Sequence, residues 1–158
     1  MSGIFISLGS NLGDRSENLS KALQLLSTKC TIFGASSIYE TEPLYKQDQP
    51  FFLNQVIEVK TALRAHELLY FCLDIERQMG RVRSLKNEPR IIDLDLLLYK
   101  DIIINTTNLI LPHPLIQERK FVLVPLCEIS PLKIHPVLNK SMKELCEKLE
   151  TSEQVRRV

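Results

Sequence analysis

The order of predicted strands and helices in the first hundred residues constrains the fold of this chain most strongly. Apolar runs that end in Gly, Pro or polar clusters predict four strands, at residues 4–8, 30–39, 52–60 and 91–99. Apolar residues at helical spacing predict one helix after Asp14 and a second over 65–79, which ends at Gly80. The order β-α-β-β-α-β is that of the ferredoxin-like fold, an antiparallel sheet with both helices on one face. We therefore expect an α+β protein of this class.

The rest of the chain is expected to extend this core. Short strands are predicted at 102–104 and 109–111, a helix within 117–127, and a last helix that begins at Ser141. These elements, or a ligand, can cover the free face of the sheet. Since 158 residues are enough for one core and no linker or repeat is present, we expect a single domain over residues 1–158.

Composition excludes several classes of protein. The 44% hydrophobic and 25% charged residues are ordinary for a soluble globular protein. The 20 basic and 19 acidic residues leave a formal charge of +1, which argues against a nucleic-acid-binding coat but not against a local patch. No apolar run approaches the roughly 18 residues of a membrane span. Because the first twelve residues have no basic n-region followed by an apolar h-region, we expect no secretory signal.

The four cysteines lie among apolar residues and outside any Cys-x-x-Cys pair, which predicts reduced thiols and a cytoplasmic location. The chain also shows no long coiled-coil pattern and no obvious apolar edge. We therefore expect a cytoplasmic monomer that binds neither nucleic acid nor membrane.

Two carboxylates lie two residues apart in the strongest predicted strand, Ile91–Tyr99. Since alternate residues of a strand point to the same side, Asp93 and Asp95 share a face, roughly 7 Å apart along the chain. Neighbouring carboxylates repel each other, and a hard divalent cation such as Mg²⁺ relieves that repulsion and brings phosphate with it. A solvated sheet face that carries two acids is the alternative that spacing alone leaves open.

A basic segment precedes this strand. Residues 77–90 hold five basic side chains and one acid, Glu88, for a local charge of +4 in a chain whose total is +1. The five are Arg77, Arg81, Arg83, Lys86 and Arg90. Guanidinium groups bind phosphate oxygens through paired hydrogen bonds. Beside two acids, this segment indicates a metal–polyphosphate site rather than an ordinary solvated loop.

Four further side chains suit a nucleotide or a flat heterocycle. His113 lies between two prolines on a rigid loop and can donate to phosphate, and Arg119 follows it. Phe52 and Asn54 share a strand face and place an apolar ring beside an amide that both donates and accepts. A half-exposed sheet face or the core is the alternative for that pair. The turn Ser10–Gly13 has neither the Rossmann nor the Walker spacing.

Together these motifs resemble the 6-hydroxymethyl-7,8-dihydropterin pyrophosphokinase family of folate biosynthesis. The resemblance runs from residue 4 to about residue 131, and its most specific part is Pro89-Arg90-Ile91-Ile92-Asp93-Leu94-Asp95. The other matching segments are 7–14, 39–44, 49–54, 80–83, 112–114 and 119–121. The resemblance implies a ferredoxin-like core and transfer of pyrophosphate from ATP to the hydroxymethyl group of the dihydropterin, with release of AMP. Two Mg²⁺ ions are implied as cofactors.

The resemblance also implies roles for individual residues. Asp93 and Asp95 would hold both metal ions, and Asp95 either acts as a ligand alone or also accepts the hydroxyl proton. The residues implied in catalysis are Arg81, Arg83, Arg90 and Asp95. Those implied in ATP binding are Glu76, Arg81, Arg83, Arg90, His113 and Arg119. Those implied around the pterin are Thr41, Pro43, Leu44, Phe52, Asn54 and Phe121, with the two phenyl rings on opposite faces of the pterin.

The chain departs from the family pattern in three places. Asn87 and Glu88 stand where the family often has Trp and Gly, in a loop that is one residue shorter than a common family form. The resemblance therefore does not establish that this loop closes over bound ligands. Phe52 replaces the Tyr of some members, so stacking is kept without a hydroxyl. Leu73 replaces the Gln of some members and removes one polar contact to ATP.

Two other functions stay open on the residues alone. A different Mg²⁺-dependent nucleotidyltransferase would use the same carboxylates but would release pyrophosphate instead of AMP. A non-enzymatic RNA-binding module of ferredoxin-like fold would need exposed aromatic residues on its central strands. The aromatic content of 6% and the near-neutral charge argue against that module.

Overall fold

The computed structural model describes residues 2–44, 48–81 and 88–158 of the chain. Its elements are β1 (Ile4–Ser10), α1 (Arg15–Leu26), β2 (Cys30–Ala35), β3 (Tyr39–Thr41), β4 (Phe52–Thr61), α2 (Ala65–Gln78), β5 (Asp93–Tyr99), β6 (Ile104–Asn105), β7 (Ile110–Leu111), a 3₁₀ turn (Ile116–Glu118), α3 (Lys120–Ile129), α4 (Met142–Lys148) and β8 (Val155–Arg157). Asp14 accepts the Glu17 N–H at the start of α1, and Ser141 opens α4 with a capping box, as the spacing predicted.

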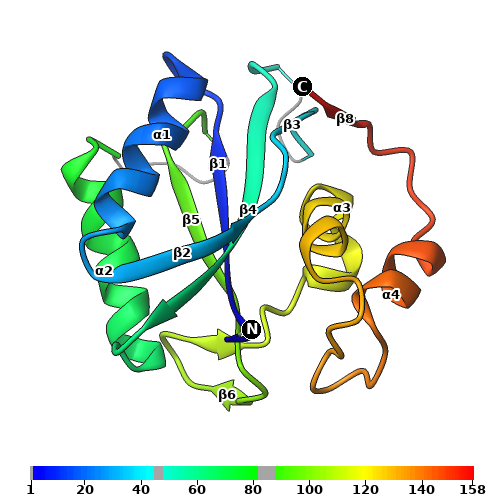
Figure 1. Cartoon of the computed structure of the whole chain (residues 1–158). Helices are drawn as coiled ribbons and strands as arrows, with labels where there is room; N and C mark the ends of the chain where they lie inside the picture. Colours follow the sequence, from blue (N-terminus) through cyan, green and yellow to red (C-terminus); the bar gives the residue numbers. More distant parts are fainter. Residues whose placement is uncertain (1, 45–47, 82–87) are drawn as a thin grey trace.

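A six-stranded antiparallel sheet lies between two layers of helices (Figure 1). The strand order is β5-β1-β4-β3-β8, and β2 pairs with another part of β4. Helices α1 and α2 cover one face, and α3 and α4 cover the other (Figure 1). This confirms the predicted α+β, ferredoxin-like arrangement, with the extension after β5 filling the second face.

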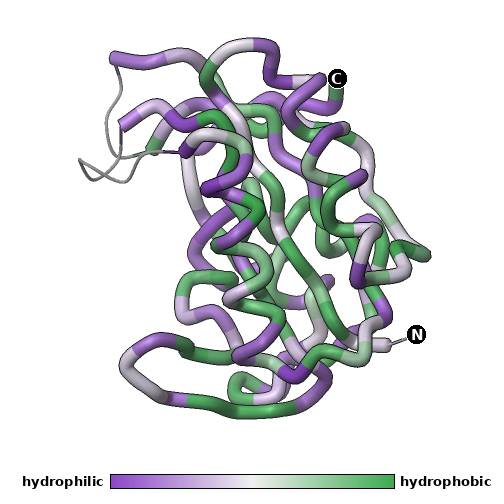
Figure 2. The backbone as a smooth tube through the Cα atoms, turned by 90° about the vertical axis from the view of Figure 1, so that its left-hand side faces the viewer, coloured by the Kyte–Doolittle hydropathy of each residue, from purple (hydrophilic) through white to green (hydrophobic). Residues whose placement is uncertain are grey.

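Each face of the sheet has its own core, because alternate strand residues point in opposite directions. Ile4, Ile6 and Leu8 of β1 pack with α1 and α2, whereas Phe5 packs with α3 and α4. Seen from the α1 and α2 side, both helices alternate between hydrophobic and hydrophilic segments, as expected of helices with one buried side (Figure 2). The two cores fix the positions of the strand ends that carry the polar residues discussed below.

The predicted alternation along β5 is correct at its start and wrong at its end. Leu94 and Leu96 pack with the first core, opposite to the face that carries Asp93 and Asp95. The pairing with β1 then shifts register, and Leu98 joins Leu97 in the second core. This bulge places two successive leucines on the α3 side. Leu98 therefore does not share a face with Leu96, although regular alternation along 91–99 predicts that it would.

The predicted strand at 30–39 is two strands, β2 and β3. Between them the Ser36 hydroxyl accepts the Val56 N–H at 3.0 Å, while the Ser36 N–H donates to the Val56 carbonyl at 2.9 Å. A side chain thus replaces one backbone acceptor of the ladder and lets the chain change direction. Strand β8, which the sequence did not indicate, pairs with β3. Among the residues described, no helix is both long and apolar enough to cross a membrane.

Candidate active site

A pocket opens where β3, β4 and β5 meet the start of α3. Its lining residues are Thr41, Glu42, Pro43, Leu44, Gln49, Phe52, Asn54, Arg90, Asp93, Arg119 and Phe121. The face of β4 that carries Phe52 and Asn54 also carries Val56, which packs under α3. That alternation turns Phe52 and Asn54 toward Phe121. The pocket therefore collects all six residues predicted to surround a pterin, together with three charged groups predicted for the phosphate side.

Two aromatic rings of the pocket each lie beside an arginine. The guanidinium carbon of Arg90 is 5.7 Å from the ring centroid of Phe52, and that of Arg119 is 5.5 Å from the ring centroid of Phe121. These cation–π contacts hold the arginines next to the rings. Because each guanidinium group lies over its ring, a flat heterocycle that stacks on the same face of that ring would have to displace it.

The amide of Asn54 is buried and fixed. Its Nδ2 donates to Thr41 Oγ1 at 2.7 Å. Its carbonyl oxygen faces Gly9 of β1, where an added Cβ would lie only 2.8 Å from Asn54 Oδ1. A side chain at position 9 would therefore displace the amide, and the glycine keeps room for it.

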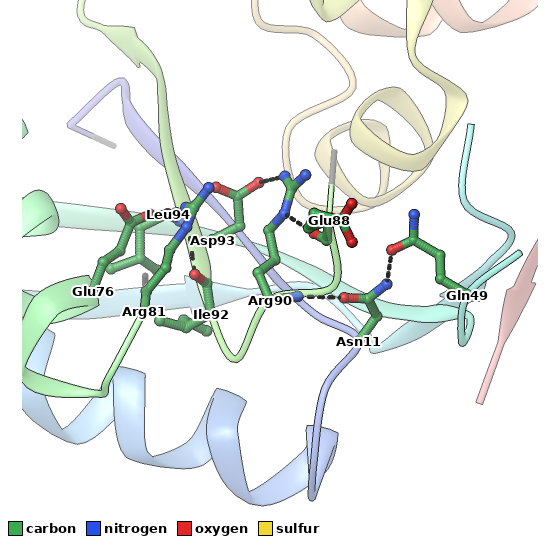
Figure 3. Close-up of polar contacts among 9 residues, drawn as sticks. All are labelled: Asn11, Gln49, Glu76, Arg81, Glu88, Arg90, Ile92, Asp93 and Leu94. Carbon is green, nitrogen blue, oxygen red and sulfur yellow. Dashed lines mark hydrogen bonds and ion pairs between the residues drawn. The ribbon is translucent and has the colours of Figure 1, made fainter. Parts of the chain in front are cut away.

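Asp93 accepts hydrogen bonds from two arginines that approach it from two sides (Figure 3). Arg81 donates to Oδ1 at 2.5 Å and Arg90 donates to Oδ2 at 3.0 Å. Burial favours the protonated acid, but the two guanidinium groups outweigh it and hold the pKa of Asp93 below its usual value. Asp93 is thus an ionised carboxylate paired with two arginines, one of which it shares with Glu76.

Asp95 lies on the same face of β5 as Asp93, but its pKa is shifted in the opposite direction. Burial, and then repulsion from Asp93, raise the pKa of Asp95 to about 7, although Arg119 acts against them. One of two neighbouring carboxylates is therefore only partly ionised near neutral pH. This shortage of positive charge, with hard oxygen donors, fits a divalent cation. In the described ranges no third His, Cys, Asp or Glu joins them in a metal-binding cluster, so phosphate and water would supply the remaining ligands.

Glu76 is buried behind β5 and does not line the pocket. Its Oε2 accepts the Leu94 N–H at 2.7 Å and the Arg81 guanidinium at 2.9 Å. Arg81, whose side chain is only 10% exposed, therefore bridges Glu76 and Asp93. Here the structure places a predicted ATP-binding acid and a predicted phosphate-binding arginine in contact with each other.

His113 is held by backbone groups on both sides. The backbone N–H of His113 donates to the Leu97 carbonyl at 2.9 Å, and the ring Nδ1 accepts the backbone N–H of Leu115 at 3.1 Å. Burial, then the nearby charge of Arg119, lower the pKa of His113 to about 4. The ring is therefore neutral at pH 7, and its proton lies on Nε2 because Nδ1 is an acceptor. His113 does not line the pocket, and Arg83 lies outside the described residues.

Three polar residues of this region were not assigned a role from the sequence: Glu42 and Gln49, which line the pocket, and Asn11. Asn11 is fully buried; its Nδ2 donates to Gln49 Oε1 at 2.7 Å, and its Oδ1 accepts the Arg90 N–H at 2.8 Å (Figure 3). Its Nδ2 also donates to the Pro50 carbonyl at 3.1 Å. It therefore joins the ends of two loops that border the pocket. Its place in the matching segment 7–14 was the only available signal.

Comparison with known proteins identifies the family. Residues 5–131 match the pattern of 7,8-dihydro-6-hydroxymethylpterin-pyrophosphokinase (HPPK). A 2-amino-4-hydroxy-6-hydroxymethyldihydropteridine pyrophosphokinase of Aquifex aeolicus is 41% identical over 144 residues, which are 91% of this chain and 90% of that protein. Its namesake from Bacillus subtilis is 47% identical over 127 residues, 79% of this chain and 76% of that protein. This chain belongs to the HPPK family.

Other HPPK relatives are much longer. "Folic acid synthesis protein FOL1" of Dictyostelium discoideum is 43% identical over 136 residues, which cover 86% of this chain but only 21% of that protein. This chain thus spans about a fifth of the length of such relatives. The crystal structure of wild-type Plasmodium falciparum HPPK-DHPS superposes with a TM-score of 0.76 at 19% identity, over 92% of this chain and 44% of that one. At this identity the superposition shows a shared fold.

Proposed function

We propose that this chain transfers pyrophosphate from ATP to the hydroxymethyl group of 6-hydroxymethyl-7,8-dihydropterin and releases AMP, as a step of folate biosynthesis. We also propose that residues 1–158 act as one pyrophosphokinase domain, a cytoplasmic monomer with small-molecule substrates and no nucleic-acid partner. The observation that carries the proposal is the pocket itself. It places the aromatic pair Phe52 and Phe121 next to Asp93, Arg90 and Arg119, so that a heterocycle and a polyphosphate can meet there.

The aromatic end of the pocket suits the pterin. A pterin ring stacked between Phe52 and Phe121 would lose its hydration on both faces. The Asn54 amide, fixed by Thr41, would pair with the donors and acceptors at the ring edge. Backbone and side-chain groups of Thr41, Pro43 and Leu44 complete this wall. Selectivity for the pterin would then come from stacking together with a fixed amide.

The charged end suits the phosphates of ATP. Arg90 and Arg119 line the pocket, and His113 keeps a proton on Nε2 for donation to a phosphate oxygen. Arg81 would move from Asp93 to the phosphates, with Arg83 as a further donor. Phosphoryl-type transfer needs an aligned hydroxyl and neutralised phosphate charge, and it needs no covalent nucleophile from the protein. We assign Arg81, Arg83, Arg90 and Asp95 to this catalytic work.

Asp93 and Asp95 are the residues that would hold two Mg²⁺ ions. Bound Mg²⁺ would neutralise phosphate charge and lower the pKa of the substrate hydroxyl. Glu76 would support the ATP side from behind β5, where its carboxylate accepts hydrogen bonds from the Arg81 guanidinium and the Leu94 N–H. Asp95 would serve as a ligand and, in its ionised form, as a nearby acceptor for the hydroxyl proton.

Product analysis tests the proposal. The protein is incubated with ATP, Mg²⁺ and 6-hydroxymethyl-7,8-dihydropterin, and the nucleotide products are separated by chromatography. We expect AMP and a diphosphorylated pterin in equal amounts. Release of pyrophosphate, with the nucleotide attached to the acceptor, would support the nucleotidyltransferase instead. Absence of any pterin-dependent product would refute the proposal.

A further inference from the structure

Glu153 is a buried acid that the proposed chemistry does not use. It is 5% exposed, although it lies in the segment 151–158, beyond the residues that match the family pattern. Its Oε1 accepts the Lys120 N–H at 3.1 Å, and its Oε2 accepts the Phe121 N–H at 2.9 Å. The carboxylate therefore binds the backbone of the residue whose ring forms one wall of the pocket.

This contact replaces a helix cap that the local sequence lacks. Helix α3 begins at Lys120, and its N-cap residue, Arg119, makes no side-chain capping bond. The first N–H groups of a helix have no partner within the helix, and a negative charge near them is favourable. Glu153 supplies both acceptors from more than thirty residues along the chain. The start of α3 is thus held by a distant segment rather than by its own neighbours.

The same segment also contacts the opposite wall of the pocket. The Gln154 N–H donates to Glu42 Oε1 at 3.2 Å, and Val155 of β8 pairs with Thr41 of β3. Figure 1 shows β8 beside β3, at the end of a segment that leads up from α4. Residues 153–155 therefore connect the wall that carries Phe121 with the wall that carries Thr41 and Glu42.

We propose that Glu153 is a positioning residue of the pterin pocket, which sets the distance of Phe121 from Phe52 by holding the first turn of α3. The inference rests on the proposed function and deepens it, because it assigns pterin affinity partly to a segment outside the family match. In Glu153→Gln the shape is kept, but one carboxylate oxygen becomes an NH₂ group that faces a backbone N–H. One of the two bonds is then lost, and the first turn of α3 is free to move.

The test compares Glu153→Gln with Glu150→Gln, which removes the same charge at an exposed position just before the segment 151–158. Binding of fluorescent 6-hydroxymethylpterin is measured with Mg²⁺ and a non-hydrolysable ATP analogue, and steady-state constants are measured for both substrates. In Glu153→Gln we expect the Kd and KM for pterin to rise about fivefold, with the KM for ATP and kcat at saturating pterin changed less than about twofold. Glu150→Gln should match the unaltered protein.

A role in stability alone would lower Tm without this split between the two substrates. Unchanged pterin Kd and KM in a folded Glu153→Gln variant, or an equal loss for both substrates, would overturn the inference while leaving the proposed function intact. Absence of pterin binding by the unaltered protein would instead overturn the proposed function. Hydrogen exchange of residues 120–124 then decides whether Glu153 holds α3: faster exchange in Glu153→Gln than in Glu150→Gln supports this, and equal exchange contradicts it.

Discussion

The two ends of the pocket differ in how they are prepared for a ligand. At the aromatic end, which is the proposed pterin end, Asn54 is bound to Thr41, and the rings of Phe52 and Phe121 already line the pocket. At the charged end, Asp93 is bound to Arg81 and Arg90, so the groups proposed to bind metal and phosphate bind each other. Uncharged side chains such as these can take their places in advance, whereas buried charged side chains have to compensate one another until the ligand brings other charges.

The pairing at the charged end has a consequence for binding. Arg81 bridges two acids, Glu76 and Asp93, with its side chain only 10% exposed. Binding of a metal–nucleotide complex would exchange the Arg81–Asp93 contact for contacts to phosphate and cation. We therefore expect substitutions at the charged end to change both stability and activity, and substitutions at the pterin end to change mainly pterin affinity.

The largest effect is expected from Asp95→Asn. Loss of a proposed metal ligand should lower AMP formation by about a thousandfold or more. Tm should stay equal or rise slightly, because the variant removes an acid that Asp93 repels. Asp101→Asn is the matched control, since the Asp101 side chain is 81% exposed. Undiminished AMP formation in Asp95→Asn would contradict the metal assignment.

Arg81→Met should lower both the stability of the fold and the activity. Removal of the guanidinium breaks the ion pair with the buried Glu76 and should lower the free energy of unfolding by about 3 kcal/mol, together with a fall in kcat of about a hundredfold. The double variant Arg81→Met/Glu76→Gln should recover most of the stability but not the activity. Chemical denaturation and AMP assays check this, and Arg77→Met, at a 74% exposed side chain, is the control. Recovery of activity in the double variant would contradict a role of Arg81 at the phosphates.

Phe121→Ala should weaken the binding of only one of the two substrates, the pterin. Loss of one stacking face should raise the KM for pterin by about tenfold, with the Kd for a non-hydrolysable ATP analogue changed less than about twofold. Calorimetry and steady-state kinetics measure the two quantities. Phe33→Ala, at an exposed ring on β2, is the control. Equal losses for both substrates would show that the two ends are not separable in this way.

The smallest effect is expected from Glu128, which supports the pterin wall from outside. Its carboxylate accepts the Tyr39 hydroxyl at 2.7 Å and the Ser37 N–H at 3.1 Å. Partial burial raises the pKa of Glu128, but these bonds, Tyr39 first, outweigh it and leave the pKa below the ordinary value. A depressed folded-state pKa stabilises the fold above the unfolded pKa, and this stabilisation is lost as pH falls through the folded value.

Glu128→Gln should therefore lower the free energy of unfolding by about 1 kcal/mol at pH 7. The difference between the variant and the unaltered protein should shrink as pH falls below the ordinary pKa of a glutamic acid. Urea denaturation at pH 7 and in mild acid gives both values. A difference that grows toward acid pH would contradict the assigned direction.

The sequence predicted those features that depend on local pattern. Alternation placed Phe52 with Asn54 and Asp93 with Asp95, and capping residues located the starts of two helices. The resemblance added Thr41, Pro43, Leu44 and Phe121, which the structure brings to the same pocket. Their predicted roles stay predictions, because the pocket shows only that these side chains meet.

The remaining features depend on contacts between distant segments. The bulge before Leu98 depends on the register of β5 against β1, and the change of direction at Ser36 depends on a bond to β4. The bridge formed by Arg81 and the hydrogen bonds of Asn11 and Glu153 join residues that are far apart along the chain or separated by a loop. Local periodicity carries no signal for such pairs.

A crystal structure with Mg²⁺, a non-hydrolysable ATP analogue and 6-hydroxymethylpterin tests most directly whether the two ends form one active site. The account predicts a pterin between Phe52 and Phe121, metal ions at Asp93 and Asp95, and an Arg81 guanidinium that has left Asp93 for the phosphates. A bound nucleotide elsewhere, with the Arg81–Asp93 contact of Figure 3 intact, would contradict it.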